Sequence, residues 1–240
     1  VPTDGLASRP ALINVGGQVA EYDLSPKGER ALFVAHGEVF TAPIEKGTVR
    51  NLTRSSNAHD KAPAWSPDGR KIVYISDRTG EEELWLINQD GSGPAEQLTR
   101  GGKAMRYHPD WSPDSKKIAF SDKDGKLYVL TVADKSVIEI ANERRGLLQD
   151  HVWSPDSNYI AYSQSDDNGF RSIWIWSAAE NKTRRITSEM FNETSPSWDP
   201  EGNYLYVTTG QEFNPTYSDL DNTWVYAGTT RLAAIPLRAD

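Results

Sequence analysis

The chain has 240 residues, 37% of them hydrophobic and 25% charged, which is enough for one large or two small globular domains with a buried core. Its formal net charge of −8 argues against a nucleic-acid partner. The absence of Cys excludes disulfides, thiol nucleophiles and iron–sulfur ligation, and without a run of 18 apolar residues no membrane span is predicted. The chain starts Val-Pro-Thr-Asp-Gly, without Met, which suggests an excised or processed chain.

The first predicted element is an N-terminal strand, Pro10–Val15, followed by Gly16-Gly17. It resembles Glu96–Thr99, which stands before Gly101-Gly102. We therefore interpret it as the outer strand of a repeating unit.

One short string then recurs along the chain. It reads Leu-Ser-Pro-Lys-Gly at 24–28, Trp-Ser-Pro-Asp-Gly at 65–69, Trp-Ser-Pro-Asp-Ser at 111–115 and 153–157, and Trp-Asp-Pro-Glu-Gly at 198–202. Its prolines lie 41, 46, 42 and 45 residues apart, a period typical of repeat architectures. We place the repeats around 10–53, 54–99, 100–141, 142–187 and 188–240, within one domain.

Segments with the composition of β-strands follow each string. The first of them are rich in β-branched and aromatic residues: Arg30–Ala35, Lys71–Ser76, Lys117–Ser121, Tyr159–Ser163 and Tyr204–Thr208. A second segment has an aromatic residue near its start, and a third ends in strings such as Gln-Leu-Thr at 97–99. With the strand before each turn, a repeat has four antiparallel strands. The pattern predicts an all-β fold, a β-propeller with four-stranded antiparallel blades.

The two ends of the repeat series leave the ring size open. The fifth repeat stops at its third strand, Arg231–Leu237, and the predicted strand Pro10–Val15 is an extra one at the start. Together they would complete a closed ring of five blades and leave no bare edge strand. The alternative is that the chain is a piece of a larger propeller.

The repeated residues are better explained by structure than by chemistry. Trp65, Trp111, Trp153 and Trp198 stand before the same turn, which favours packing between blades over a stacking platform for a ligand. The serines beside them are interpreted as turn residues, because a nucleophile needs an oriented base and occurs once. We assign no catalytic residue in this chain.

Two sets of motifs resemble known families. The Trp-Ser-Pro-Asp-Gly string and the strand Leu-Trp-Leu-Ile-Asn at 84–88 resemble TolB-like repeats, also called PD40 or WD40-like repeats. The stretches at 16–28 (Gly-Gly-Gln-Val-Ala-Glu-Tyr-Asp-Leu-Ser-Pro-Lys-Gly) and 37–43 (Gly-Glu-Val-Phe-Thr-Ala-Pro), with the insertion Gly210–Thr230, resemble the second, larger propeller of tricorn-type proteases. This resemblance covers almost the whole chain.

The tricorn resemblance implies a parent protein with a seven-bladed propeller, of which five repeats are present, and so favours the fragment over the closed ring. It also implies a serine peptidase whose catalytic groups lie in a separate C-terminal region, with the propellers gating or guiding peptides. The implied partners are peptides and other domains or subunits of the protease, with self-association left open. We expect no cofactor and no bound metal. The cytoplasm is favoured by the resemblance, with the periplasm as the alternative.

Three histidines are candidates for contact with a substrate path. His59, His108 and His151 are expected on the connections into the innermost strands, at one rim of the central channel. No histidine pair has zinc-ligand spacing. The strings Asp122-Lys-Asp124-Gly125 and Asn88-Gln-Asp90-Gly91 resemble half of a calcium loop, yet both stand where a hairpin turn is expected.

Strand parity indicates where the working surface lies. The connections between first and second strands and between third and fourth strands share one face, which has the tight Ser-Pro turns. The opposite face has the longer segments 54–62, 100–108, 141–150 and 188–195 and the insertion at 210–230. Loops on a rigid scaffold carry function. We predict peptide or domain contacts there, with Phe213, Tyr217 and Trp224 of the insertion as candidates.

The leading hypothesis is a non-catalytic propeller domain of a tricorn-like serine protease. Its rivals are a stand-alone TolB-like interaction scaffold and a propeller enzyme with a site in the central channel.

Overall fold

The computed structural model describes residues 17–55, 57–211, 215–217, 224–226 and 228–237. Every regular element in these ranges is a β-strand, which confirms the predicted all-β class. This part of the chain includes no helix with the length and hydrophobicity that a membrane crossing needs.

The strands form five larger antiparallel sheets and one small hairpin. The first sheet has β1 (Val19–Leu24), β2 (Arg30–Ala35), β3 (Glu38–Pro43) and β4 (Arg50–Asn51). The second has β5 (Asp60–Trp65), β6 (Lys71–Ser76), β7 (Glu83–Asn88) and β8 (Glu96–Gln97). The third has β9 (Arg106–Trp111), β10 (Lys117–Asp122), β11 (Lys126–Thr131) and β12 (Val137–Asn142).

The fourth sheet has β13 (Val152–Trp153), β14 (Tyr159–Ser165), β15 (Arg171–Ser177) and β16 (Lys182–Arg185). The fifth has only three described strands, β17 (Glu193–Trp198), β18 (Tyr204–Thr209) and β21 (Arg231–Pro236). Between its last two strands stands the hairpin β19 (Pro215–Tyr217) and β20 (Trp224–Tyr226).

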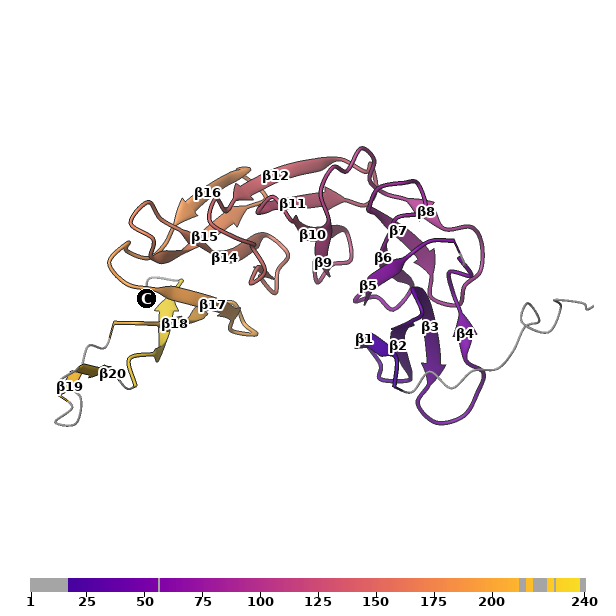
Figure 1. The fold of residues 1–240 in the computed structure, drawn as a ribbon, viewed down its shortest axis with the longest axis horizontal. Helices are drawn as coiled ribbons and strands as arrows, with labels where there is room; N and C mark the ends of the chain where they lie inside the picture. The colour runs from indigo at the N-terminus through magenta and orange to yellow at the C-terminus, as the bar shows by residue number, and fades with distance from the viewer. Residues whose placement is uncertain (1–16, 56, 212–214, 218–223, 227, 238–240) are drawn as a thin grey trace, which may run out of the picture.

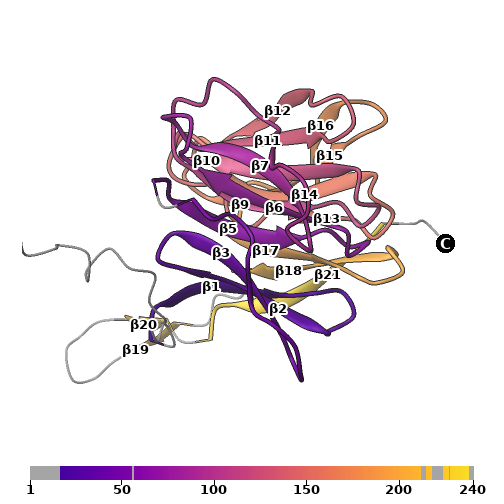
Figure 2. The same ribbon diagram turned by 90° about the vertical axis from the view of Figure 1, so that its right-hand side faces the viewer.

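The five sheets stand side by side around an open arc (Figure 1). In each sheet the chain starts at the inner edge, with β1, β5, β9, β13 or β17, and moves outward strand by strand. Figure 2 shows the same sheets stacked behind one another, with the first and fifth lying at the same level. This arrangement is that of propeller blades, as the sequence predicts.

Each Ser-Pro string closes the turn between the first two strands of a sheet. Ser66 Oγ donates to Asp68 Oδ1 at 2.6 Å and accepts the Lys71 N–H at 2.9 Å. Gly69 takes a φ of 73°, which suits glycine. The third and fourth sheets repeat the Ser–Asp contact at 2.6 Å, so these hydroxyls serve the turn.

Serine replaces that glycine in two turns and links neighbouring sheets. Ser115 and Ser157 adopt φ values of 60° and 63°, a strained region for a non-glycine residue. Their hydroxyls accept the backbone N–H of Asp68 and Asp114 in the preceding sheet, both at 3.0 Å. The hydrogen bonds between sheets offset the backbone strain.

The core lies between the sheets. One buried cluster joins Val73, Ile75 and Leu84 of the second sheet to Trp111 and Phe120 of the third. Further clusters join the first sheet to the second, the third to the fourth, and the fourth to the fifth. Burial of large apolar side chains between sheets is therefore what holds the arc together.

The repeated tryptophans lie at these junctions, as predicted. The indole Nε1 of Trp111 donates to the Ala64 carbonyl at 3.2 Å, and Trp153 donates to the Asp110 carbonyl at 3.2 Å. Trp198 donates to the carbonyl of Val152 at 3.1 Å. Each ring thus fills the space between two sheets and ties their inner strands together.

The arc is open, so the five described sheets do not form a closed ring (Figure 1). Leu24, which stands where other sheets have Trp, is 56% exposed on the free face of the first sheet. Leu232 of the fifth sheet is 74% exposed, whereas the matching Leu84 is fully buried. The predicted strand Pro10–Val15 lies outside the described residues.

Candidate functional site

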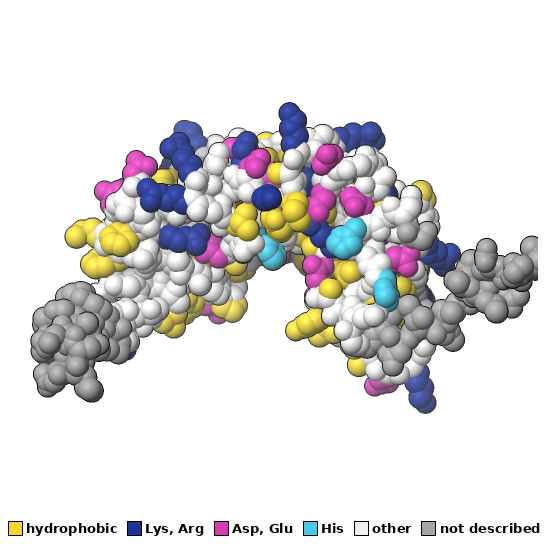
Figure 3. Space-filling view, in the orientation of Figure 1, with side chains coloured by type: hydrophobic (Ala, Val, Ile, Leu, Met, Phe, Trp, Pro, Cys, Tyr) yellow, Lys and Arg dark blue, Asp and Glu magenta, His cyan; other side chains and the backbone are white. Residues whose placement is uncertain are grey.

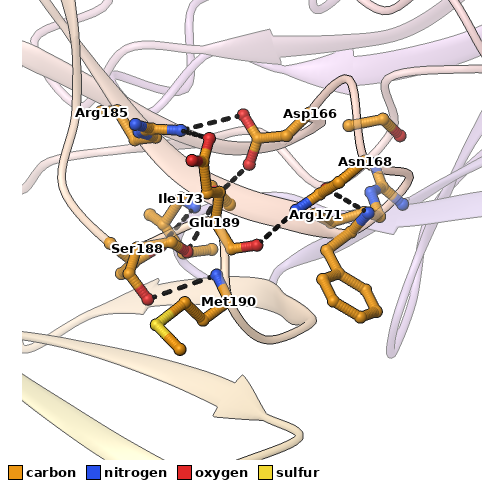
Figure 4. Close-up of polar contacts among 12 residues, drawn as sticks. Asp166, Asn168, Arg171, Ile173, Arg185, Ser188, Glu189 and Met190 are labelled. Carbon is orange, nitrogen blue, oxygen red and sulfur yellow. Dashed lines mark hydrogen bonds and ion pairs between the residues drawn. The ribbon is translucent and has the colours of Figure 1, made fainter.

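The two faces of the arc differ as predicted. We call the face with the Ser-Pro turns the Ser-Pro face, and the opposite one the loop face. The loop face has the turns between second and third strands and the connections from one sheet to the next. On this face, the turn at 166–170 and the connection at 186–192 meet between the fourth and fifth sheets (Figure 4).

Arg185 of β16 is the centre of the contacts that hold these two segments. Its Nη1 lies 3.3 Å from Asp166 Oδ1 and 2.9 Å from Glu189 Oε2, so the guanidinium bridges turn and connection. Its guanidinium also lies over the Trp174 ring, 5.9 Å from the centroid. Because Asp166 is largely buried, this pair loses less to solvent screening than an exposed pair does.

Further hydrogen bonds fix the backbone of both segments. Asn168 Nδ2 donates to the Glu189 carbonyl at 2.6 Å, and Asn168 Oδ1 accepts the Phe170 N–H at 2.9 Å. The Arg171 N–H donates to Asn192 Oδ1 at 3.0 Å. The two segments therefore form a connected and ordered surface.

This surface presents apolar side chains to solvent. Phe170 is 41% exposed and Met190 is 68% exposed, one on each segment. Beside them is a hollow of about 300 Å³ with polar and apolar walls. We call it the loop-face hollow; its walls are formed by Phe170, Met190, Phe191, Asn192, Thr194, Thr208, Thr209, Gly210, Thr229 and Thr230.

The predicted insertion starts and ends at this hollow, since Gly210 and Thr230 are both wall residues. Of its three candidates, Phe213 lies outside the described residues. Tyr217 and Trp224 are register partners in the β19–β20 hairpin. The structure thus gives the insertion a two-stranded hairpin in its middle, and the ends of the insertion, Gly210 and Thr230, stand at the hollow.

His59 lies apart from the other two candidate histidines. It stands directly before β5, as predicted, and is exposed on the loop face. Its backbone N–H donates to Asp77 Oδ1 at 2.7 Å. Its ring packs close to Gly37 in the first sheet, where a Cβ atom would come within 3.1 Å of it.

The prediction that all three histidines lie on connections was wrong for His108, which lies inside β9. The inner strand starts earlier than expected because a bulge with φ of 48° at His108 precedes Pro109 and lets the strand continue. The same positive φ before proline recurs at Ala62 and Ser195. His108 is exposed to solvent.

His151 stands directly before β13 and is buried. Neither ring nitrogen has a hydrogen-bond partner in the described part of the chain. Burial, with a smaller effect from the nearby His108, lowers the pKa of His151 to about 4. The ring is therefore neutral at pH 7, and it takes the place that Pro63, Pro109 and Pro196 have in three of the other four inner strands.

Sequence reasoning did not single out Asp110, which stands in β9 near His108. Its side chain is accessible to solvent, yet the surrounding protein desolvates it and raises its pKa to about 6. No group of three or more His, Asp or Glu residues in the described ranges is arranged to hold a metal ion. The half calcium-loop string at Asp122 is a turn, in which Asp122 Oδ1 accepts the N–H groups of Asp124 and Lys126.

Two larger hollows lie elsewhere on the described part of the chain. One, of about 530 Å³ between the second and third sheets, has five cationic wall residues, but three of them are paired: Arg106 with Glu83, Lys126 with Glu139 and Lys135 with Glu96. The other, of about 570 Å³, opens on the Ser-Pro face beside the fifth sheet.

Comparison with known proteins identifies the family. The model of the tricorn protease second β-propeller domain matches residues 19–240. The chain belongs to this family. The solved tricorn protease structure aligns with 92% of this chain at a TM-score of 0.80 and 16% sequence identity. A putative TolB from Agrobacterium tumefaciens aligns with 91% of the chain at a TM-score of 0.60 and 18% identity.

This tricorn-family chain is short relative to the proteins that it resembles. It covers 22% of the tricorn protease chain and 77% of the putative TolB. Among curated relatives, it is 36% identical over 55 residues to an uncharacterized protein of Agrobacterium fabrum, covering 18% of that protein. It is 29% identical over 85 residues to dipeptidyl-peptidase 5 of Porphyromonas gingivalis, covering 12% of it.

Proposed function

We propose that this chain is a non-catalytic propeller domain of a tricorn-like serine protease, which guides or gates peptide substrates and docks to other domains of the protease. The observation that carries the proposal is the loop-face hollow, where an ordered hydrogen-bonded surface exposes Phe170 and Met190. Apolar side chains held at the rim of a polar hollow suit an extended peptide, because they bury apolar area while the polar walls bond its backbone.

Family membership supports the proposal. The serine hydroxyls of the Ser-Pro turns are engaged in turn hydrogen bonds, which agrees with the non-catalytic part of the proposal. Peptides incubated with the isolated chain are expected to remain intact. Hydrolysis that a serine-directed inhibitor abolishes would contradict the non-catalytic assignment.

Peptide binding tests the position of the surface. Fluorescence anisotropy with labelled, mixed-sequence hexapeptides should show binding that Met190→Asp weakens about tenfold, since the change puts a charge on the apolar rim. Ile44→Asp is the matched control, because Ile44 is similarly exposed but stands on the Ser-Pro face. Equal loss in both variants would refute a loop-face site.

We also propose that further blades of a longer polypeptide cover the free faces of the first and fifth sheets. In the first four sheets, an outer strand pairs with the third strand. In three of them, Thr53, Thr99 and Thr187 also accept an N–H from that third strand. No described strand pairs with β21 in this way, and Leu232 is exposed there. A full-length structure with β21 still unpaired would contradict this proposal.

A second candidate function is a stand-alone TolB-like interaction scaffold, favoured by the similarity to 77% of the putative TolB chain. The full-length reading frame distinguishes the two. A serine-bearing peptidase region in the same frame supports the first function, and a frame that encodes only a propeller supports the second.

A further inference from the structure

Glu193, the first residue of β17, is a buried carboxylate that pairs with no cation among the residues that the structure describes. Its side chain is at the root of the insertion, and the residue is only 3% exposed. Its Oε1 accepts hydrogen bonds from Gln211 Nε2 at 3.2 Å and Thr209 Oγ1 at 3.4 Å. Its Oε2 is buried and has no partner among the described residues. An unpaired buried carboxylate oxygen is costly and therefore calls for an explanation.

In the second sheet, the equivalent carboxylate is paired with a cation. Asp60, the first residue of β5, is the counterpart of Glu193. Its carboxylate is 3.3 Å from Arg78 Nη2, and Arg78 follows β6 by two residues, as Gln211 follows β18. The Arg78 guanidinium lies over the rings of Tyr74 and Trp85, at 5.3 Å and 4.7 Å. In the fifth sheet an amide replaces this cation.

The third and fourth sheets also have a guanidinium over an aromatic ring near this rim. In the third, Arg106 is 2.8 Å from Glu83 and lies over Phe120 at 5.0 Å. In the fourth, Arg185 pairs with Asp166 and lies over Trp174. A paired guanidinium is thus a recurrent feature that the described part of the fifth sheet does not supply to Glu193.

The aromatic pair that accompanies the cation is also replaced at its register position in the described part of the fifth sheet. In the other four sheets, the second-strand residue that stands seven positions after the turn proline is aromatic, and so is its register partner in the third strand. These pairs are Phe33–Phe40, Tyr74–Trp85, Phe120–Tyr128 and Tyr162–Trp174. In the fifth sheet the pair is Val207–Ala233. Within the described residues of the fifth sheet, Glu193 is therefore retained without the cation and the aromatic pair.

Glu193 is directly beside the loop-face hollow. Its neighbours Asn192 and Thr194 are wall residues, and so is its hydrogen-bond partner Thr209. Phe170 and Phe191 add aromatic rings to the same walls. Gln211 is exposed, so its amide can leave Glu193 when a stronger donor enters.

We propose that the loop-face hollow binds the arginine side chain of a peptide, whose guanidinium displaces the Gln211 amide and pairs with both oxygens of Glu193. A guanidinium is favoured over an ammonium because its planar fork donates to two carboxylate oxygens at once and stacks on aromatic rings. The inference rests on the proposed function, since it names the substrate class of the same surface.

The test compares labelled hexapeptides that differ only at one central residue, arginine or its neutral isostere citrulline. Fluorescence anisotropy with the 240-residue chain should give at least about tenfold tighter binding of the arginine peptide. In Glu193→Gln this preference should fall to about twofold or less. The matched control is Glu45→Gln, which removes the same charge from an exposed turn of the first sheet and should leave the preference unchanged.

Gln211→Ala provides a second measurement that does not depend on the folding of the Glu193 variant. Because it removes the amide that arginine must displace, it should raise the affinity for the arginine peptide about threefold and leave that for the citrulline peptide unchanged. A merely structural role of Gln211 would change both alike. Thermal melting of each variant checks that the fold is intact.

The outcomes separate this inference from the function on which it rests. Equal binding of both peptides to the unmodified chain, or a preference that survives in Glu193→Gln, overturns the arginine site and leaves peptide guidance standing. If neither peptide binds the unmodified chain, both fail. Loss of the preference in Glu193→Gln together with its increase in Gln211→Ala supports both.

Discussion

At the scale of single residues, the tryptophans at the sheet junctions have two separable roles. Their rings fill space between sheets, and three of their indole N–H groups also bond a carbonyl of the preceding inner strand. Trp65 differs, because its Nε1 is buried without a partner in the described residues. The indole of Trp65 therefore contributes packing without a hydrogen bond.

This difference predicts unequal costs for the same substitution. Trp111→Phe loses a hydrogen bond and leaves the Ala64 carbonyl unpaired, whereas Trp65→Phe removes a donor that had no partner. We expect Trp111→Phe to lower the free energy of unfolding by about 1 kcal/mol more than Trp65→Phe does. Urea denaturation of both variants measures the difference. Equal losses of unfolding free energy would mean that the indole hydrogen bond of Trp111 contributes nothing to stability beyond packing.

His151 makes the stability of the fold depend on pH. Its pKa is about 4 in the folded chain, below the ordinary value of 6.5, so the unfolded chain binds more protons between these values. Its contribution to stability is therefore fully present above pH 6.5 and is lost as the pH falls toward 4.

We expect His151→Leu to remove this acid sensitivity. Between pH 7 and pH 4.5, the unmodified chain should lose about 2 kcal/mol more unfolding free energy than the variant does. Urea denaturation at the two pH values tests this, with the exposed His36 replaced by Leu as the control. Identical pH profiles for His151→Leu and the unmodified chain would contradict the assignment.

At the scale of elements, equivalent strand positions have different environments at the middle and at the end of the arc. Leu84 of β7 and Leu232 of β21 stand at the same register position of their sheets. Leu84 is fully buried against the third sheet, and Leu232 faces solvent.

We expect Leu84→Ala to lower the unfolding free energy by about 2 to 5 kcal/mol through cavity formation. Leu232→Ala should change it by less than about 0.5 kcal/mol, because its side chain has little contact to lose. Calorimetry or urea denaturation of this pair provides the comparison. A large cost for Leu232→Ala would show that the free face is covered in solution.

The strands and turns could be predicted from the sequence because their causes are local. Pro67, Asp68 and Gly69 specify a turn by their own backbone preferences, and the segment Lys71–Ser76 matches β6 at both ends. The site could not be predicted in the same way. Glu193 resembles Asp60 only when strands of two sheets are compared in register, and the bulge that places His108 inside β9 depends on pairing with β10.

At the scale of the whole molecule, the described arc has a free sheet face at each end, and both faces expose apolar side chains. Tyr22 and Leu24 are exposed on the first sheet, and Leu232 and Tyr204 on the fifth; Figure 3 shows hydrophobic side chains at both free ends. Exposed apolar patches of this kind promote association.

We expect the isolated chain to self-associate as its concentration rises, and Leu24→Glu with Leu232→Glu to reduce this association about tenfold or more. Light scattering over a concentration series measures it. Small-angle scattering at low concentration should fit an open arc, and a profile that fits a closed ring instead would contradict the structure.

The sheet-to-sheet core has a consequence for how the chain unfolds. In the clusters that the described residues form, each sheet packs on its immediate neighbours. The total stability therefore approaches a sum of unit and junction contributions, as in a one-dimensional array. In such an array the terminal units have one junction and the central ones have two. Amide hydrogen exchange should therefore be slowest in β10 and β11 and quicken toward both ends. The arc would then unfold sheet by sheet, with the first and fifth sheets losing their structure before the central ones.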